Sequence, residues 1–288
     1  MNICIVGLGL LGGSMSLGLK SVHKDIIILG VDNNAGNARR ALELGIADQI
    51  VPFDEGVKNA ELVILATPVD ILTEQIGQVL EILPEQAILT DLGSTKEKVC
   101  KIADLHPRRA RYVAVHPIAG TENSGPEAAF SSLLKHKMMI ICDREKSDPE
   151  AVNRLEKLFR SLDMRIVYMN SVEHDRHIAY VSHLSHISSF ALGSTVLDKE
   201  KDERSIFAMA GSGFSSTVRL AKSSPDMWAP IFSQNQKNVS EALDAYIKKL
   251  QYFKEIIDRN DLSGSYFLMK EANEIRRVLQ GISKEEPE

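Results

Sequence analysis

The chain has 288 residues, 44% of them hydrophobic and 25% charged, with a net charge of −5. This length suits one large domain or two modest ones with a sizeable core, and the slightly acidic balance gives no reason to expect a nucleic-acid partner. No apolar run approaches the roughly 20 residues that cross a bilayer, so we expect no membrane contact. The apolar N-terminus lacks a basic leader, so we expect no signal peptide. Three cysteines without a paired motif favour reduced thiols in a cytoplasmic protein.

The first half of the chain alternates short β-branched runs with amphipathic stretches. The predicted strands are Asn2–Val6, Ile26–Val31, Leu62–Ala66, Ala87–Thr90, Tyr112–Val115, Met138–Cys142 and Arg165–Tyr168. The predicted helices between them are Leu11–Ser21, Ala35–Leu44, Asp70–Leu83, Lys96–Leu105 and Pro149–Ser161. This alternation predicts an α/β fold of the Rossmann type, a doubly wound parallel sheet covered on both faces. The short basic run 107–111 is interpreted as a solvated loop.

After about Asn170 the strand signals disappear and helical patterns take over. These are Ser171–Leu197, Arg204–Ala210, Ser216–Ala221, Pro225–Lys249 and a last stretch ending near Leu279. The segment 178–197 is apolar or small on most sides, so it needs cover that a second subunit could partly supply. We therefore predict a nucleotide-binding domain over 1–169, an all-α C-terminal dimerisation domain over 170–282 and a disordered tail over 283–288.

A glycine-rich turn joins the first strand to the first helix. Gly7, Gly9 and Gly12 form a G-x-G-x-x-G pattern, and Asp32 ends the second strand about 20 residues later. The first glycine permits the tight turn, the second lets the backbone approach a pyrophosphate, and the third lets helix and strand pack closely. An acid at the end of the second strand accepts hydrogen bonds from a ribose hydroxyl and repels a 2′-phosphate. The pattern predicts a dinucleotide site that prefers NAD over NADP.

Ligands of a doubly wound sheet sit beyond the carboxyl ends of its strands. Those ends carry Thr67-Pro68, Ser94 in the run DLGSTK, and His116. Thr67 and Ser94 could simply cap the helices that follow them, and His116 could be a hydrogen-bonded residue at a strand end. A serine and a histidine on the cofactor side are also well placed to flank a substrate hydroxyl, with the histidine taking its proton.

The sequence resembles the prephenate dehydrogenase family, which includes the arogenate dehydrogenases. The resemblance rests on GLGLLGGS (7–14), DLGSTK (91–96), HPIAGTENSG (116–125), VSHLSH (181–186) and GFSSTVRLAKSSPDMW (213–228). It implies an NAD-dependent oxidative decarboxylation of prephenate to 4-hydroxyphenylpyruvate in tyrosine biosynthesis, carried out by a homodimer. Hydride leaves ring carbon C4 as its hydroxyl loses a proton, and carbon dioxide leaves C1.

The same resemblance implies roles for individual residues. His116 is expected to be the general base on the C4 hydroxyl, with Ser94 orienting that hydroxyl beside the cofactor, and Arg219 is expected to bind a substrate carboxylate. The residues expected to line the substrate pocket are His186, Thr121, Glu122 and Gly213. Those expected around the cofactor are Gly7, Gly9, Leu10, Leu11, Gly12, Asp32, Thr67, Pro68 and Ser94. Trp228 matches a family tryptophan and is otherwise interpreted as core or interface.

Four histidines of the helical half raise the question of a metal site. At about 100° per residue, a helix places His174 opposite His183 and His177 opposite His186. Four ligands cannot converge from such a helix, so no metal is expected, and His183 is interpreted as a packed, satisfied histidine.

Three alternatives stay open from the sequence. Arogenate dehydrogenase performs the same chemistry on an amino acid side chain. A β-hydroxyacid dehydrogenase would need a catalytic lysine on the long helix, and Ser171–Leu197 contains none. A protein that binds NAD without catalysis would have no use for a serine and a histidine at the nicotinamide face.

Overall fold

A computed structural model describes the backbone of residues 1–202 and 205–279. By its internal contacts the chain divides into two compact units, Met1–Gln236 and Lys237–Glu288. Among the described residues, no helix combines the length and the hydropathy that a membrane span requires. The predicted tail lies outside the described residues, and the predicted domain boundary at residue 170 stays a prediction.

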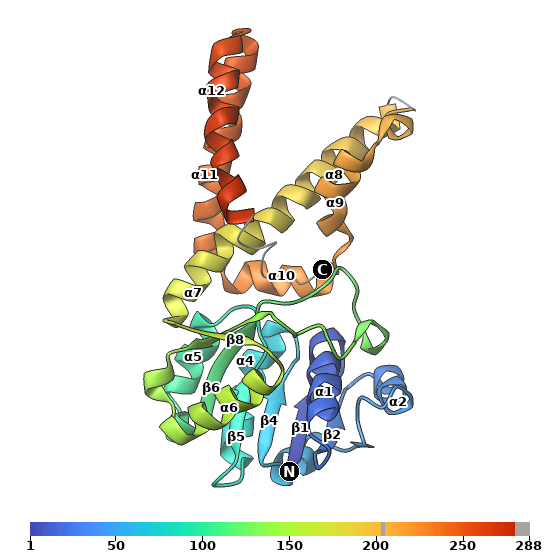
Figure 1. The fold of residues 1–288 in the computed structure, drawn as a ribbon, viewed down its shortest axis with the longest axis vertical. Helices are drawn as coiled ribbons and strands as arrows, with labels where there is room; N and C mark the ends of the chain where they lie inside the picture. Colours follow the sequence, from blue (N-terminus) through green and yellow to red (C-terminus); the bar gives the residue numbers. More distant parts are fainter. Residues whose placement is uncertain (203–204, 280–288) are drawn as a thin grey trace. The chain divides into compact units, whose positions relative to one another are not determined.

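The first unit is built on one eight-stranded sheet (Figure 1) with the order β3-β2-β1-β4-β5-β6-β7-β8. The strands are β1 (Asn2–Val6), β2 (Ile27–Val31), β3 (Gln49–Ile50), β4 (Leu62–Leu65), β5 (Ile88–Asp91), β6 (Tyr112–Pro117), β7 (Met138–Cys142) and β8 (Arg165–Met169). Strands β1 to β6 are parallel, β7 is antiparallel to β6, and β8 is parallel to β7. The predicted Rossmann-type sheet is confirmed, with two reversed strands at one edge.

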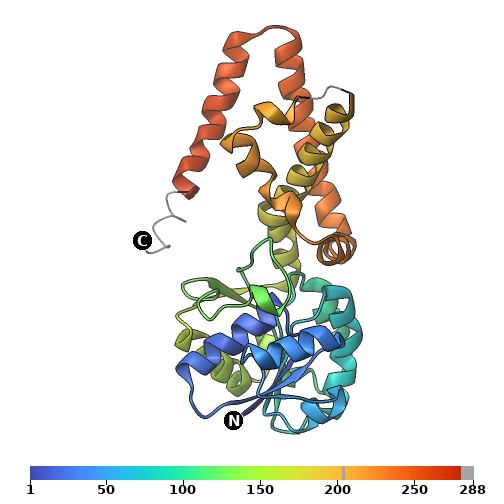
Figure 2. The ribbon, with the colours of Figure 1, turned by 90° about the vertical axis from the view of Figure 1, so that its right-hand side faces the viewer.

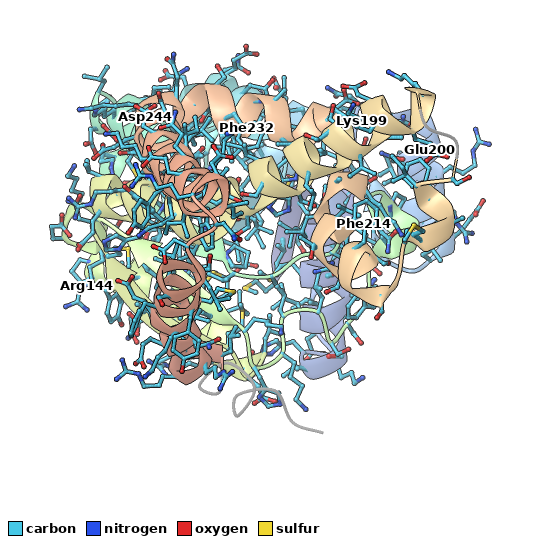
Figure 3. All side chains as sticks on the ribbon, turned by 90° about the horizontal axis from the view of Figure 1, so that it is seen from above. Arg144, Lys199, Glu200, Phe214, Phe232 and Asp244 are labelled. Carbon is cyan, nitrogen blue, oxygen red and sulfur yellow. The ribbon has the colours of Figure 1, made fainter. Side chains whose placement is uncertain are left out.

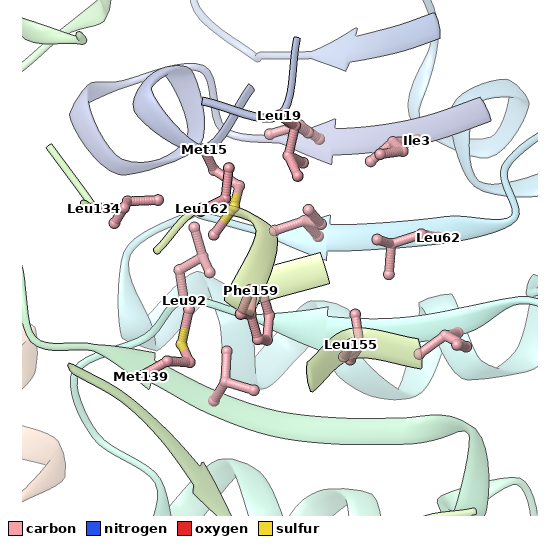
Figure 4. Close-up of a cluster of buried hydrophobic side chains, with 14 of the residues drawn as sticks. Ile3, Met15, Leu19, Leu62, Leu92, Leu134, Met139, Leu155, Phe159 and Leu162 are labelled. Carbon is pink, nitrogen blue, oxygen red and sulfur yellow. The ribbon is translucent and has the colours of Figure 1, made fainter. Parts of the chain in front are cut away.

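Six helices cover the two faces of this sheet (Figure 2). They are α1 (Leu10–Val22), α2 (Ala35–Glu43), α3 (Phe53–Lys58), α4 (Val69–Ile82), α5 (Glu97–Asp104) and α6 (Pro149–Ser161). Alternate residues of β1 point to opposite faces: Ile3 and Ile5 join a core with α1 and α6, which Figure 4 shows, while Cys4 and Val6 join a core with α3, α4 and α5. Both faces are therefore buried, as a parallel sheet requires.

The rest of the first unit is helical. It contains α7 (Ser171–Ile178), a π-helical turn (Ala179–His183), α8 (Leu184–Asp202), α9 (Ser212–Val218) and α10 (Pro225–Gln234). Figure 3 looks down on these helices and labels Lys199 and Glu200 on α8, Phe214 on α9 and Phe232 on α10. The second unit consists of α11 (Gln236–Asp258), whose first residue belongs to the first unit, and α12 (Leu262–Ala272). The predicted all-α second half is confirmed.

Several elements differ from the sequence prediction. The two-residue strand β3 and the short helix α3 were not predicted, because neither is long enough to show a period. The predicted helix 225–249 is two helices separated at Asn235. Of the predicted helix 204–210, residue 204 lies outside the description, and only the 3₁₀ turn Phe207–Met209 is present.

The basic run 107–111 is not the solvated loop that we predicted. The Arg108 guanidinium donates to the carbonyl oxygen of Leu80 at 2.9 Å, and that of Arg111 donates to Ala87 at 2.9 Å. Both side chains are partly buried. These arginines donate to backbone carbonyl oxygens near the end of α4 and before β5. Their guanidinium groups therefore tie this loop to neighbouring elements instead of lying free in solvent.

Two aspartates fix α7 against the sheet. Asp143, directly after β7, accepts hydrogen bonds from the backbone amide and the hydroxyl of Ser171 at 2.8 and 2.7 Å. In return, the Asp175 carboxylate on α7 accepts from the first amides of α5, Lys96 at 2.7 Å and Glu97 at 2.9 Å. Each carboxylate satisfies helix amides that have no partner within their own helix. The start of α7 and the start of α5 are therefore held by residues distant in sequence.

Candidate active site

The glycine loop has the geometry that the motif predicts. Gly7 has a φ of +93°, and a Cβ there would lie 2.7 Å from the Ala66 carbonyl oxygen, while a Cβ on Gly12 would lie 2.0 Å from the Gly7 oxygen. A Cβ on Gly9 would meet nothing within 4 Å. Gly9 is also the N-cap of α1 and supplies no side-chain cap. The loop is thus closely packed behind and open in front, where the first amides of α1, from Leu10 on, can bind a phosphate.

The acid at the end of β2 lies against this loop. Asp32 Oδ2 accepts from the Leu8 amide at 2.9 Å, and its Oδ1 accepts from the Asn34 amide at 2.8 Å. The parallel register of β1 and β2 brings the two strand ends together, Val6 beside Val31. Leu11, also assigned to the cofactor, packs partly against the core, so only its backbone can serve the loop.

Thr67 and Pro68 follow β4 at the same edge of the sheet. Thr67 does not cap α4, because its hydroxyl donates to Gln75 Oε1 at 2.8 Å and the N-cap position belongs to Pro68. Thr67 is half-buried and Pro68 exposed. Both residues therefore border the accessible edge beside the glycine loop, as the cofactor assignment requires.

Ser94 is also not a helix cap. Helix α5 begins at Glu97, and the side chain that bonds its first amides is Asp175, not a serine. Ser94 is half-buried, and its hydroxyl has no hydrogen bond to any residue that the structure describes. Strands β5 and β6 are parallel neighbours, with Thr90 beside Val113. The turn bearing Ser94 and the end of β6 therefore open at one edge.

His116 lies near the end of β6 and is buried. Its Nδ1 is 2.8 Å from Nε2 of His174, and the rings meet edge to face. Burial, followed by the neighbouring His174, Lys96 and His183, holds the pKa of His116 well below its usual range. Within the described residues no hydrogen bond is made by His116 Nε2. The ring is thus neutral at physiological pH and keeps one nitrogen for a ligand.

A buried charge cluster supports the same strand ends. The Lys96 ammonium, fully buried, pairs with Asp91 and donates to the Val115 carbonyl oxygen at 2.7 Å. The Tyr112 hydroxyl donates to the other Asp91 oxygen at 2.6 Å, and burial raises the pKa of Tyr112 well above its ordinary value. Sequence reasoning noted Lys96 only as part of a motif and missed the cluster, although an acid and a lysine bounding one strand-end turn were a usable signal.

Arg219 and Glu122 are brought together from distant parts of the chain. Arg219 Nη1 lies 3.1 Å from Glu122 Oε2, and the arginine side chain is 53% exposed. The pKa of Glu122 is lowered, first by a hydrogen bond from its own backbone amide and then by Arg219. Thr121 Oγ1 accepts from the Asn123 amide at 3.2 Å, and Gly213 is exposed on α9. The pair is partly exposed, so the guanidinium can be reached from solvent.

Two histidines contact Trp228: His183 at the end of the π-helical turn and His186 in the first turn of α8. The His186 ring stacks on the indole with centroids 3.7 Å apart, and burial lowers its pKa. His183 is fully buried, and burial lowers its pKa to about 4. Its Nδ1 lies 3.2 Å from the side-chain amide nitrogen of Asn235, but its Nε2 and Trp228 Nε1 are buried and have no hydrogen-bond partner among the described residues. His183 is packed, as predicted, but the prediction that it is satisfied is wrong for Nε2.

Among the described residues, no three His, Cys, Asp or Glu side chains converge in a way that could hold a metal ion. The π-helical turn breaks the constant angular step on which the sequence argument against a metal relied. His174 faces His116 instead, a contact that no local pattern predicts.

Comparison with known proteins gives matches over nearly the whole chain. Residues 15–168 match the family model "Prephenate dehydrogenase, nucleotide-binding domain", and residues 170–271 match "Prephenate dehydrogenase, dimerization domain". Prephenate dehydrogenase of Bacillus subtilis is 32% identical over 280 residues, 96% of this chain and 75% of that protein. Cyclohexadienyl dehydrogenase of Zymomonas mobilis is 29% identical over 283 residues, 97% of this chain and 96% of that protein.

Among solved structures, prephenate dehydrogenase from A. aeolicus in complex with hydroxyphenyl propionate and NAD+ has a TM-score of 0.89 at 32% identity, and the match covers 97% of this chain and 98% of that one. A Rossmann sheet with an open glycine loop, an acid at the end of β2 and a neutral histidine near the end of β6 defines a nucleotide-dependent dehydrogenase. The chain belongs to the prephenate dehydrogenase family.

Proposed function

We propose that the protein oxidises and decarboxylates prephenate to 4-hydroxyphenylpyruvate with NAD as hydride acceptor. The observation that carries this proposal is a buried, neutral His116 whose Nε2 makes no hydrogen bond to the described residues, near the end of β6, the strand beside β5 and its Ser94 turn. The relatives include prephenate and cyclohexadienyl dehydrogenases, and a solved relative is in complex with NAD+.

The residues at the glycine loop fit the dinucleotide. The space in front of Gly9 admits a pyrophosphate, and the uncapped start of α1 offers its amides. The Asp32 carboxylate is in place to accept from a ribose hydroxyl and to repel a 2′-phosphate, which favours NAD over NADP. A nicotinamide bound there would supply the hydride acceptor for the substrate carbon.

The chain's own residues handle the proton and the carboxylates. His116 Nε2 takes the proton of the C4 hydroxyl, and the Ser94 hydroxyl orients it. The Arg219 guanidinium binds a substrate carboxylate as a planar double donor, and His186 and the loop with Thr121 and Glu122 form the pocket wall. Loss of carbon dioxide from C1 leaves a phenolate, and the proton held by the protein returns to that oxygen.

The proposal is tested by NADH formation with prephenate. His116→Asn is expected to lower kcat by roughly 10²- to 10⁴-fold with little change in KM, because asparagine removes the base but keeps a side chain of similar size. His136→Asn is the matched control, since His136 is exposed and its φ of 60° suits asparagine. Near-normal turnover of His116→Asn from pH 6 to 9 would remove the base assignment. Tight NAD binding without any reduction by the wild type would favour a non-catalytic NAD-binding protein.

Arg219→Ala is expected mainly to raise the KM for prephenate, with the exposed Arg154→Ala as control. An unchanged KM would place the carboxylate site elsewhere.

A second candidate substrate is arogenate, whose side chain carries an ammonium. The Glu122 carboxylate beside Arg219 favours it, because an acid in the pocket can pair with that ammonium. Parallel assays with both substrates, each with NAD and NADP, decide between them by the ratio of kcat/KM values.

We further propose a cytoplasmic homodimer in which residues 1–169 bind the cofactor and 170–282 provide the dimer contact. The match of 170–271 to a dimerization-domain model supports the contact, as do large apolar side chains exposed on the second unit, among them Ile257 and Phe267. All three cysteines are buried free thiols, which suits a reducing compartment. A molar mass of one chain by light scattering would contradict the dimer.

A further inference from the structure

His116 is the first of three buried side chains joined by hydrogen bonds, and the proposed reaction has not yet used the two behind it, His174 and Asp175. His116 Nδ1 is 2.8 Å from His174 Nε2, and His174 Nδ1 is 2.7 Å from Asp175 Oδ1. The exposed fractions of the three residues are 8%, 1% and 2%. His174 and Asp175 lie on α7, so the helical segment and the sheet meet at this chain.

The hydrogen-bonding roles in this chain follow from its end. An ionised carboxylate only accepts, so His174 Nδ1 must carry a hydrogen to bond Asp175. A neutral His174 then has a bare Nε2, which can only accept, so His116 Nδ1 must carry the hydrogen between the two rings. The remaining nitrogen of His116, Nε2, is therefore left with a free lone pair. That is the nitrogen without a hydrogen bond to the described residues.

We propose that His174 and Asp175 are positioning residues that hold His116 in the Nδ1–H tautomer, so that its Nε2 is always ready to take the substrate proton. This inference rests on the proposed function of His116 as the base. The arrangement follows the logic by which a buried carboxylate fixes the tautomer of a catalytic imidazole, with a second imidazole placed between the two.

Neighbouring groups fix the hydrogen-bonded series His116–His174–Asp175. Asp175 also accepts from the Lys96 and Glu97 amides, so its carboxylate has little freedom to rotate. Among the described residues, three ionisable groups besides burial lower the pKa of His116: His174, Lys96 and His183. The Lys96 charge is balanced by Asp91, and His183, with a pKa of about 4, is neutral.

The protonated state of His116 is stabilised through the same chain. After Nε2 has accepted the hydroxyl proton, the imidazolium still donates from Nδ1 to His174, whose own hydrogen points to the negative Asp175. The proton stays on buried rings until carbon dioxide has left, and then returns to the phenolate oxygen. No net proton is released to solvent by these residues.

Two variants at one position separate hydrogen bonding from packing. His174→Phe keeps an aromatic ring without a hydrogen-bond acceptor, whereas the amide oxygen of His174→Gln can still accept from His116 Nδ1. We expect kcat to fall roughly 10- to 100-fold in His174→Phe and by a smaller factor in His174→Gln, with the KM for prephenate within about twofold. His177→Gln is the control, because His177 is exposed on the same helix. Equal losses in the two His174 variants, or an unchanged kcat in His174→Phe, would overturn the inference.

The tautomer itself is measured by two-bond ¹H–¹⁵N correlation spectra of protein labelled at its histidines, with His116→Asn identifying the His116 signals. We expect Nδ1–H in the wild type and in His174→Gln, and Nε2–H in His174→Phe. A wild-type His116 with its hydrogen on Nε2 would refute the proposal even if neither His174 variant folded. The spectra need no substrate, so a protein that fails to oxidise prephenate but shows Nδ1–H would contradict the function and leave the positioning intact.

Discussion

Replacement of Lys96 by methionine tests the buried charge cluster beneath the active-site turns. Lys96 and Asp91 are both fully buried, and the lysine also donates to the Val115 oxygen. Removing one partner of a buried ion pair costs about 3–5 kcal/mol, because the other charge stays buried. Asp91 would keep two donors, the Tyr112 hydroxyl and the Gly93 amide. We therefore expect Lys96→Met to lower the free energy of unfolding by about 3 kcal/mol.

Urea unfolding followed by circular dichroism measures this loss. Lys98→Met is the matched control, since Lys98 is exposed in the first turn of α5, two residues after Lys96, and we expect it to stay within about 0.5 kcal/mol of the wild type. The double variant Lys96→Met with Asp91→Asn should regain part of the loss, because the uncompensated charge is removed. A Lys96→Met protein as stable as the control would refute this account of the cluster. A double variant that loses more unfolding free energy than the two single variants together would refute it as well.

Three further predictions concern the cofactor loop and the buried histidines. Gly12→Ala places a Cβ 2.0 Å from the Gly7 oxygen and should lower stability by about 1–3 kcal/mol, whereas Gly9→Ala, with nothing within 4 Å, should leave the melting temperature unchanged and weaken only NAD binding in a fluorescence titration. Asp32→Ala should raise the KM for NAD roughly 10- to 100-fold and reduce the preference for NAD over NADP. Steady-state assays with both cofactors measure the two effects. His183 has a folded pKa of about 4 against an ordinary 6.5, so neutral His183 contributes stability above pH 6.5 that is lost as the pH falls toward 4. Urea midpoints across that range should fall less steeply in His183→Leu than in the wild type.

Much of the nucleotide-binding half was predictable, because its signals are local. Glycines at three positions, an acid at the next strand end and apolar strands of four to six residues each have a short-range physical cause. The interpretation of Ser94 as a helix cap failed because the residue that bonds the first amides of this helix is distant in sequence. The group that satisfies the amides of α5 is Asp175, 79 residues beyond Lys96, and no window of sequence contains both.

The helical half shows where periodicity misleads. A constant angular step was applied across Ala179–His183, where the chain instead forms a π-helical turn. The same assumption hid the partner of His116, since His174 was weighed only as a metal ligand. An acid directly after that histidine was a visible signal for an oriented imidazole, but its target lies 58 residues earlier. Contacts of that range depend on packing of the whole unit.

Hydrogen bonds between Asp143 and the start of α7, and between Asp175 on α7 and the start of α5, limit how this protein can be combined with a relative in a chimera. A chimera joined near residue 170 would take Asp143 and the amides of Lys96 and Glu97 from one parent, and Ser171 and Asp175 from the other. The two parents must therefore supply partners that fit each hydrogen bond. Otherwise the start of α5 and the His174 ring both lose the carboxylate that holds them. An exchange of domains between relatives would therefore carry a mismatch at this junction to His174 and, through it, to His116, the proposed base.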